Sequence, residues 1–192
     1  MKYLGGVLLF AATVAWGQTS PVPNAAKLQP FIRIVQQQFG SSFALAQKFP
    51  TPVITTDLDG DGVEDLVMVA ESKDPLPDSY QYKYVVEDPY HSFFGFGDVR
   101  ETAAMGRFDP QNHPLLVVFG AGAQAWRAAT PKAKFVLINV PFDSIEVGRM
   151  LVKPKKPPIF VIKAVEAQEM ESSVFWDAKK KRWRWEPGNT ID

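Results

Sequence analysis

The alternation of apolar and polar residues divides the chain into one helical stretch followed by a series of short strands. Between residues 24 and 39 the apolar residues recur at helical spacing, and one face collects Leu28, Phe31, Ile32, Val35 and Phe39. Gly40 is a natural stop for such a helix. Because proline is tolerated in the first turn and disfavoured further along, Pro30 predicts that the regular helix begins near Gln29.

After residue 40 the pattern changes to short apolar runs that are bounded by turn residues, which is typical of strands. The clearest pair is Val53–Thr56 and Leu66–Ala70, which flank a single short loop. Further strands are expected over Leu115–Phe119, Phe135–Val140 and Ile159–Val165, and a hairpin over Ser172–Trp176 and Arg182–Trp185. In that hairpin Val174 and Trp176 share a face, as do Trp183 and Trp185, so cross-strand aromatic pairing is expected.

Two segments are less regular. Tyr80, Tyr82 and Tyr84 alternate with polar residues, which predicts a strand that carries three tyrosines on one face. Residues 144–152 are compatible with a strand or with a short helix. Taken together, these elements predict an α+β fold over residues 18–192. Its N-terminal helix would pack on a mostly antiparallel sheet of about six to eight strands.

The loop between the first two strands carries the most specific chemistry in the sequence. It reads Asp57-Leu58-Asp59-Gly60-Asp61-Gly62-Val63-Glu64-Asp65, with aspartates at positions 1, 3, 5 and 9. Alternating carboxylates on a curling loop can converge on one point, and Ca²⁺ takes six to eight oxygen ligands. We expect Asp57, Asp59, Asp61 and Asp65 to bind Ca²⁺, with the carbonyl oxygen of Val63 as a further ligand. The alternative is an acidic turn without a metal, since Asp and Gly are ordinary turn residues.

The loop resembles the calcium loops of the FG-GAP and VCBS repeat families, which read roughly D-x-[DN]-G-D-G-x-x-D between two strands. The matching residues are Asp57, Asp59, Gly60, Asp61, Gly62 and Asp65, and the resemblance covers about residues 53–70. It implies that the four aspartates bind calcium. The sequence contains no second loop of this kind, so a full propeller of at least four blades is not expected. An EF-hand fits less well, because the twelfth position is Met68 and the flanks are strands.

Residues 1–17 resemble a secretory signal peptide, with Lys2, an apolar run from Leu4 to Ala15, and small residues before Gln18. We therefore expect a secreted or periplasmic protein with no membrane span after cleavage.

The chain contains 21 basic and 21 acidic residues and no cysteine, so disulfides are excluded. This balanced charge gives no electrostatic case for a nucleic-acid partner.

The sequence makes a weak case for an enzyme. It has no cysteine nucleophile and no G-x-S-x-G motif, and His91 and His113 do not stand in a zinc-binding spacing. The favoured function is an exported, non-enzymatic binding or structural domain with a structural Ca²⁺ and an unknown protein or carbohydrate partner. One alternative is a secreted carbohydrate-active hydrolase that uses the Tyr80–Phe96 stretch as its substrate surface. Another is a protein-interaction module that uses the C-terminal aromatic hairpin.

Overall fold

The computed structural model describes residues 25–101, 108–109, 111–151, 157–167 and 170–188, so the predicted signal peptide lies outside the described residues. The helices are α1 (Ala25–Phe39), α2 (Ser79–Tyr82), α3 (Pro89–Phe93) and the short 3₁₀ segment η1 (Gly122–Arg127). The first six strands are β1 (Phe43–Leu45), β2 (Val53–Thr56), β3 (Asp65–Ser72), β4 (Val85–Glu87), β5 (Arg100–Glu101) and β6 (Leu115–Phe119). The remaining strands are β7 (Ala133–Leu137), β8 (Ser144–Met150), β9 (Ile159–Glu166), β10 (Met170–Asp177) and β11 (Arg182–Pro187).

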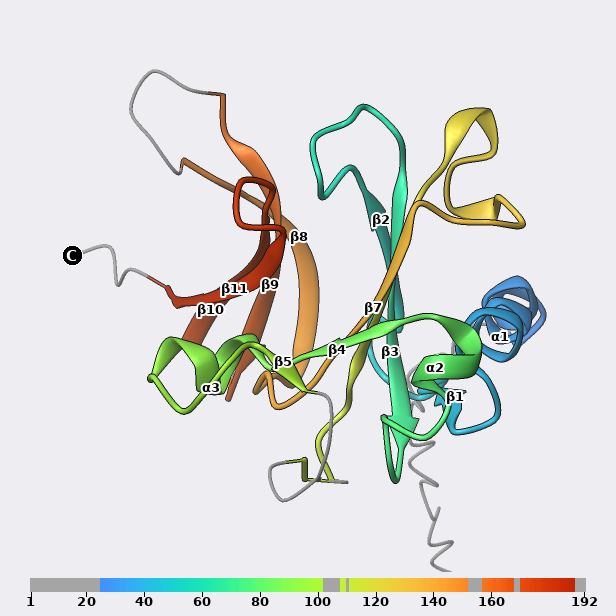
Figure 1. Cartoon of the computed structure of the whole chain (residues 1–192), viewed down its shortest axis with the longest axis horizontal. Coiled ribbons are helices and arrows are strands. Elements are labelled where there is room, and N and C mark those ends of the chain that lie inside the picture. The colour runs from blue at the N-terminus through green and yellow to red at the C-terminus, as the bar shows by residue number, and fades with distance from the viewer. Residues whose placement is uncertain (1–24, 102–107, 110, 152–156, 168–169, 189–192) are drawn as a thin grey trace, which may run out of the picture.

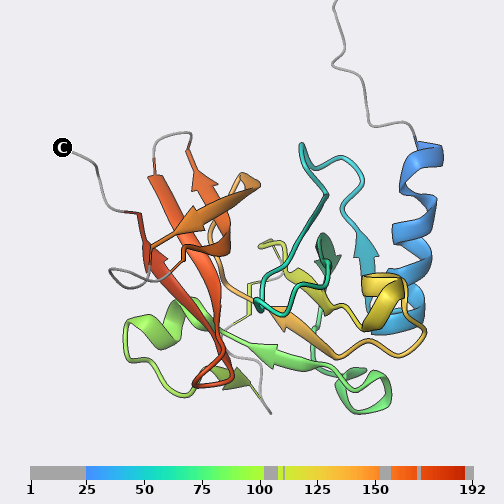
Figure 2. The same cartoon turned by 90° about the horizontal axis from the view of Figure 1, so that it is seen from above.

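The strands form two sheets that lie face to face, and α1 covers the opposite face of the larger sheet (Figures 1 and 2). The seven-stranded sheet has the order β1-β3-β6-β7-β4-β5, with β2 also paired to β3. The four-stranded sheet has the order β11-β10-β9-β8. All described pairings are antiparallel except that of β4 with β7. The prediction of a β-rich fold is confirmed, but the strands are divided between two sheets instead of forming one.

The central strands of the larger sheet are buried on both faces, which explains their unbroken apolar runs. In β3, Leu66, Met68 and Ala70 face the core beneath α1, and Val67 and Val69 face the core between the two sheets. Strands β6 and β7 alternate in the same way. The molecule therefore has three layers and two apolar cores, with β3, β6 and β7 shared by both cores.

Helix α1 begins at Ala25, four residues before the predicted start, and contains Pro30 in its interior. The prediction from Pro30 was therefore wrong. Proline removes one backbone hydrogen bond, but burial of the apolar face offsets that loss, because Leu28, Val35 and Phe39 are almost fully covered by the sheet.

The bounds of β2 and β6 agree with the prediction, and residues 144–150 form a strand. Strand β7 lies slightly earlier than predicted, at Ala133–Leu137.

The predicted tyrosine strand was wrong: Ser79–Tyr82 is one helical turn, and it ends at Lys83 with φ 55°. The tyrosines of the predicted strand do not share a face, because Tyr80 is 95% exposed and Tyr84, which follows the helical turn, is 4% exposed.

The C-terminal hairpin has the predicted form. Trp176 pairs with Trp183 across β10 and β11, and their ring centroids lie 5.7 Å apart. These rings, together with Trp185, pack into the core between the two sheets. Among the described residues, no helix is long and apolar enough to span a bilayer.

Candidate metal centre

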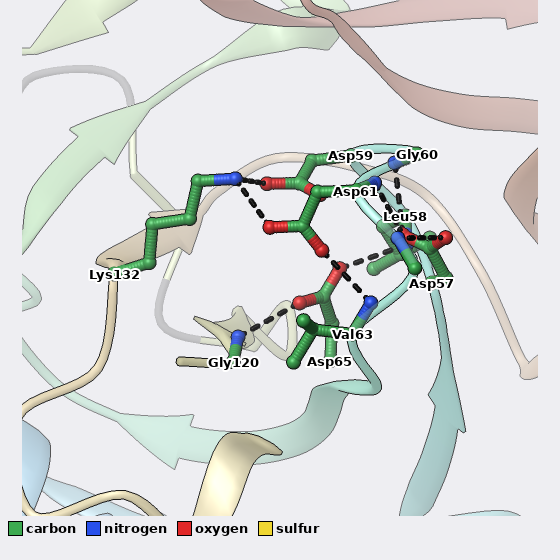
Figure 3. Close-up of polar contacts among 10 residues, drawn as sticks. Asp57, Leu58, Asp59, Gly60, Asp61, Val63, Asp65, Gly120 and Lys132 are labelled. Atoms are coloured by element: carbon green, nitrogen blue, oxygen red, sulfur yellow. Dashed lines mark hydrogen bonds and ion pairs between the residues drawn. The ribbon is translucent and has the colours of Figure 1, made fainter. Parts of the chain in front are cut away.

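The acidic loop, residues 57–65, joins the paired strands β2 and β3 (Figure 3). Gly60 and Gly62 have φ of 78° and 84°, a backbone conformation that L side chains rarely adopt. A Cβ atom at either glycine would meet nothing within 4 Å, so the need for glycine here is conformational and not steric. Glycines at these two positions let the loop curl tightly enough to bring its carboxylates together.

Three of the predicted ligands lie together in this loop. Asp57, Asp59 and Asp61 each present a carboxylate oxygen, and these three oxygens lie within 4.8 Å of one another. The Asp57 carboxylate also accepts backbone hydrogen bonds from Gly60 at 2.8 Å, Asp61 at 3.1 Å and Gly62 at 2.9 Å. These bonds fix the curl of the loop, so the aspartates are held close together by the backbone of the loop itself.

Asp65 has a different position from the other aspartates. It is 1% exposed, and its carboxylate accepts the N–H of Leu58 at 2.8 Å and the N–H of Gly120 at 2.8 Å. Burial raises the pKa of the Asp65 carboxyl to about 6. Asp65 thus ties the start of the loop to its end and to the end of β6. Its place in a calcium shell stays a prediction, since it is outside the group of three.

Val63 is also outside that group. Its side chain is half-buried, and its N–H donates a 2.9 Å hydrogen bond to Asp61 Oδ1. The role predicted for its carbonyl oxygen is untested. The neighbouring Glu64 accepts the indole N–H of Trp126 at 2.7 Å and the hydroxyl of Thr55 at 3.0 Å, and it lies 3.8 Å from Arg127 Nη1. Glu64 therefore anchors η1 against the loop.

Lys132, which precedes β7, is the residue that sequence reasoning missed. Its Nζ donates to Asp59 Oδ2 and to Asp61 Oδ2, each at 2.6 Å (Figure 3). These hydrogen bonds hold the pKa of Lys132 above its usual value, and they lower the pKa of Asp61. The sequence has no basic residue between Thr51 and Ser72, so a local reading gives no hint of this partner. The repulsion between the two carboxylates is thus balanced by an ammonium from a distant segment.

A second group of carboxylates, Glu87 and Asp88, lies at the end of β4, and we call it the buried acidic pair. The two residues are 0% and 1% exposed. Glu87 Oε2 accepts the N–H of Trp183 at 2.7 Å, and Glu87 Oε1 lies 3.7 Å from Arg100 Nε. Burial raises the pKa of Glu87.

Asp88 caps α3 and holds two further side chains. It accepts the N–H of His91 at 2.9 Å, contacts His91 Nδ1 at 2.7 Å and accepts Asn139 Nδ2 at 2.5 Å. His91, which does not stand in a zinc-binding spacing in the sequence, is partly exposed on α3. The buried acidic pair therefore joins α3, β11 and the segment after β7. No local pattern in the sequence marks this pair.

The aromatic residues proposed as binding surfaces are distributed differently from the expectation. The three tryptophans of the C-terminal hairpin pack in the core, whereas Phe93, Phe94 and Phe96 are 46%, 51% and 61% exposed. Phe93 packs edge-to-face against Trp185 with ring centroids 5.0 Å apart, and Phe94 packs against it in a tilted arrangement with centroids 5.8 Å apart. The exposed aromatic area near the hairpin therefore comes from α3 and the turn that follows it.

A comparison with known proteins identified no relative of this chain. No family model matches the chain, no curated protein matches it, and no solved structure matches its fold. The resemblance to the FG-GAP and VCBS calcium loops accordingly rests on the acidic loop alone.

Proposed function

We propose that this protein is an exported, non-enzymatic binding or structural domain in which Ca²⁺ binds the acidic loop and stabilises it. The observation that carries the proposal is the cluster of three carboxylate oxygens, from Asp57, Asp59 and Asp61, within 4.8 Å of one another. Two oxygens that each lie 2.3–2.6 Å from one Ca²⁺ are at most about 5 Å apart. The spacing of the three aspartates therefore suits one such ion.

The position of the loop supports a structural role for the ion. The loop connects β2 to β3, the strand that contributes to both apolar cores. Through Asp65 it also contacts Gly120 at the end of β6. An ion that stiffens the loop would therefore stabilise the edge of the larger sheet. A weak site suffices outside the cell, where calcium is present at millimolar concentration.

A thermal melt in calcium and in EDTA tests the proposal. At a free concentration ten times its Kd, a bound ion adds about 1.4 kcal/mol to the free energy of unfolding. For a domain of this size, that free energy raises Tm by about 3–6 °C. The double variant Asp59→Asn, Asp61→Asn should lose this calcium-dependent rise, because it removes two of the three carboxylates.

The matched control is Asp98→Asn, Asp109→Asn. It removes two exposed carboxylates that accept backbone hydrogen bonds in other turns, so it changes the net charge equally. This control should keep the full calcium-dependent rise in Tm. Equal rises in the wild type and in the loop variant would contradict the proposal, as would a wild type whose Tm does not respond to calcium.

A further inference from the structure

A pocket of about 400 Å³ lies between the C-terminal end of α1, the turn of α2 and the segment that leads into β7. Its lining includes Gln38, Gln81, Tyr82, Lys83, Lys132 and Lys134, and we call it the lysine pocket. In both views, α1, α2 and the segment around η1 lie at the same side of the molecule (Figures 1 and 2). No aspartate of the acidic loop lines the pocket, although Lys132 both lines it and pairs with Asp59 and Asp61. The charged side chains of the lining are all basic.

The three lysines of the pocket are not equivalent. Lys132 is already paired with Asp59 and Asp61. Lys134 Nζ donates a 2.9 Å hydrogen bond to the carbonyl oxygen of Gln38. An ammonium carries three donors, so this bond leaves donor capacity on Lys134. Across the described residues, neither Lys83 nor Lys134 has a carboxylate within ion-pair distance.

The charges of Lys83 and Lys134 act against each other. Burial, with the nearby charge of Lys83 as a second cause, lowers the pKa of Lys134. A partly buried cation beside another cation is unfavourable unless a negative charge compensates both. An anion in the pocket would supply that charge and would accept the remaining N–H donors.

The backbone conformation of Lys83 fixes its position relative to the pocket. Its φ of 55° and ψ of 44° place a lysine in the left-handed region, where glycine or asparagine is the less strained choice. This conformation ends α2 and sets Lys83 at the edge of the pocket beside Tyr82.

We propose that the lysine pocket binds an oxyanion, a sulfate or carboxylate group, through the ammonium groups of Lys83 and Lys134. The amides of Gln38 and Gln81 provide further polar groups in the lining, and the volume is sufficient for a single acidic sugar. The ligand is therefore either a free inorganic oxyanion or the charged group of an acidic saccharide.

Isothermal titration calorimetry of the full chain tests this site, with EDTA present so that calcium takes no part. The probes are sulfate, glucuronate and neutral glucose, each at constant ionic strength. We expect saturable binding of sulfate, with an affinity on the order of millimolar, and no binding of glucose. Binding of glucuronate as well as sulfate supports an acidic saccharide, whereas binding of sulfate alone supports a free oxyanion. Glucose binding equal to that of glucuronate would overturn the proposal, because charge would then not be recognised.

The variant Lys83→Asn, Lys134→Gln should weaken sulfate binding by about tenfold or more, because it removes both charge-assisted contacts. Asparagine suits the left-handed backbone at position 83. The control Lys179→Gln, Lys180→Gln removes two lysines from the turn of the C-terminal hairpin and should bind sulfate as the wild type does. If the double pocket variant does not fold, Lys83→Asn alone should still weaken binding measurably. Unchanged affinity in a folded pocket variant, or the absence of saturable binding in the wild type, would overturn the proposal.

Discussion

The acidic loop and the buried acidic pair contain the same kind of side chain in opposite settings. In the loop, Asp57 and Asp61 are at least partly exposed and the side chain of Asp59 is 5% exposed. The N–H groups that these three carboxylates accept belong to the loop itself. In the buried acidic pair, Glu87 and Asp88 are covered, and most of their partners come from distant segments. A local cluster of carboxylates close to the surface is suited to receiving a cation. A buried carboxylate with distant partners is suited to joining elements of the fold.

The role of Glu87 illustrates this difference. Strand β11 is an edge of the four-stranded sheet, and an edge strand exposes unpaired backbone N–H groups. Glu87, at the end of a strand in the other sheet, accepts one of these groups, the N–H of Trp183. The carboxylate therefore replaces a neighbouring strand at that position and links the two sheets.

The largest expected effect comes from Asp88→Ala. This substitution leaves the His91 backbone N–H and the Asn139 amide without their acceptor in a buried site. We expect a loss of about 3–5 kcal/mol in the free energy of unfolding, measured by urea denaturation. Asp98→Ala, at an exposed turn after α3, should cost less than about 1 kcal/mol. Similar losses in the two variants would remove the distinction between the buried acidic pair and exposed aspartates.

A pH-dependent effect is expected from Glu87. Its folded-state pKa lies above the ordinary value of 4.5 because the group is buried. As pH rises through the interval above 4.5, the unfolded chain releases this proton first, so the folded state binds more protons than the unfolded state. The contribution of Glu87 to stability therefore falls as pH rises through that interval and is greatest below it.

The variant Glu87→Gln isolates this contribution, because glutamine has a similar shape and does not titrate. The free energy of unfolding of both proteins should be measured in EDTA from about pH 4 to pH 8. The variant should gain stability relative to the wild type as the pH rises. Asp65 has a pKa of about 6 and is present in both proteins, so its influence cancels in the difference. A difference that does not change with pH would contradict the assignment.

The smallest effect on stability is expected from Lys132→Gln. Lys132 is 47% exposed, so its two ion pairs are screened by water, and their loss in EDTA should cost about 1 kcal/mol or less. The same variant should bind calcium more tightly, because the Lys132 ammonium occupies oxygens of Asp59 and Asp61 that the ion would use. Calcium titrations of the two proteins measure this change. An unchanged or weaker affinity in the variant would show that Lys132 does not compete with the ion.

The sequence predicted best where local pattern decides the structure. The bounds of β2 and β6 followed from short apolar runs between turn residues, and the convergence of three aspartates followed from their spacing and from Gly60 and Gly62. The period-two pattern of Tyr80–Tyr84 failed, because a single helical turn that ends at Lys83 separates the tyrosines onto different faces.

The remaining features depend on contacts between distant segments, which no local pattern reveals. Lys132 reaches Asp59 from 73 residues away, and Glu87 reaches Trp183 across 96 residues. The division into two sheets also depends on distant contacts. The apolar runs of β6 and β9 look alike in the sequence, and neither run indicates which strands it pairs with. The chain topology brings these residues together, and the spacing of residues in the sequence does not predict that topology.

The contact between Gly120 and the acidic loop has a consequence for how such sequences can diverge. A Cβ atom at position 120 would clash with the carbonyl oxygen of Glu64 and with the side chain of Val63, and the Gly120 N–H donates to Asp65. Position 120 and the loop are therefore expected to co-vary. Lineages that keep the aspartate at position 65 should keep glycine at position 120. Loss of the loop alone would not free that position, because a Cβ atom there would also lie 2.9 Å from the backbone carbon of Ala125 in η1.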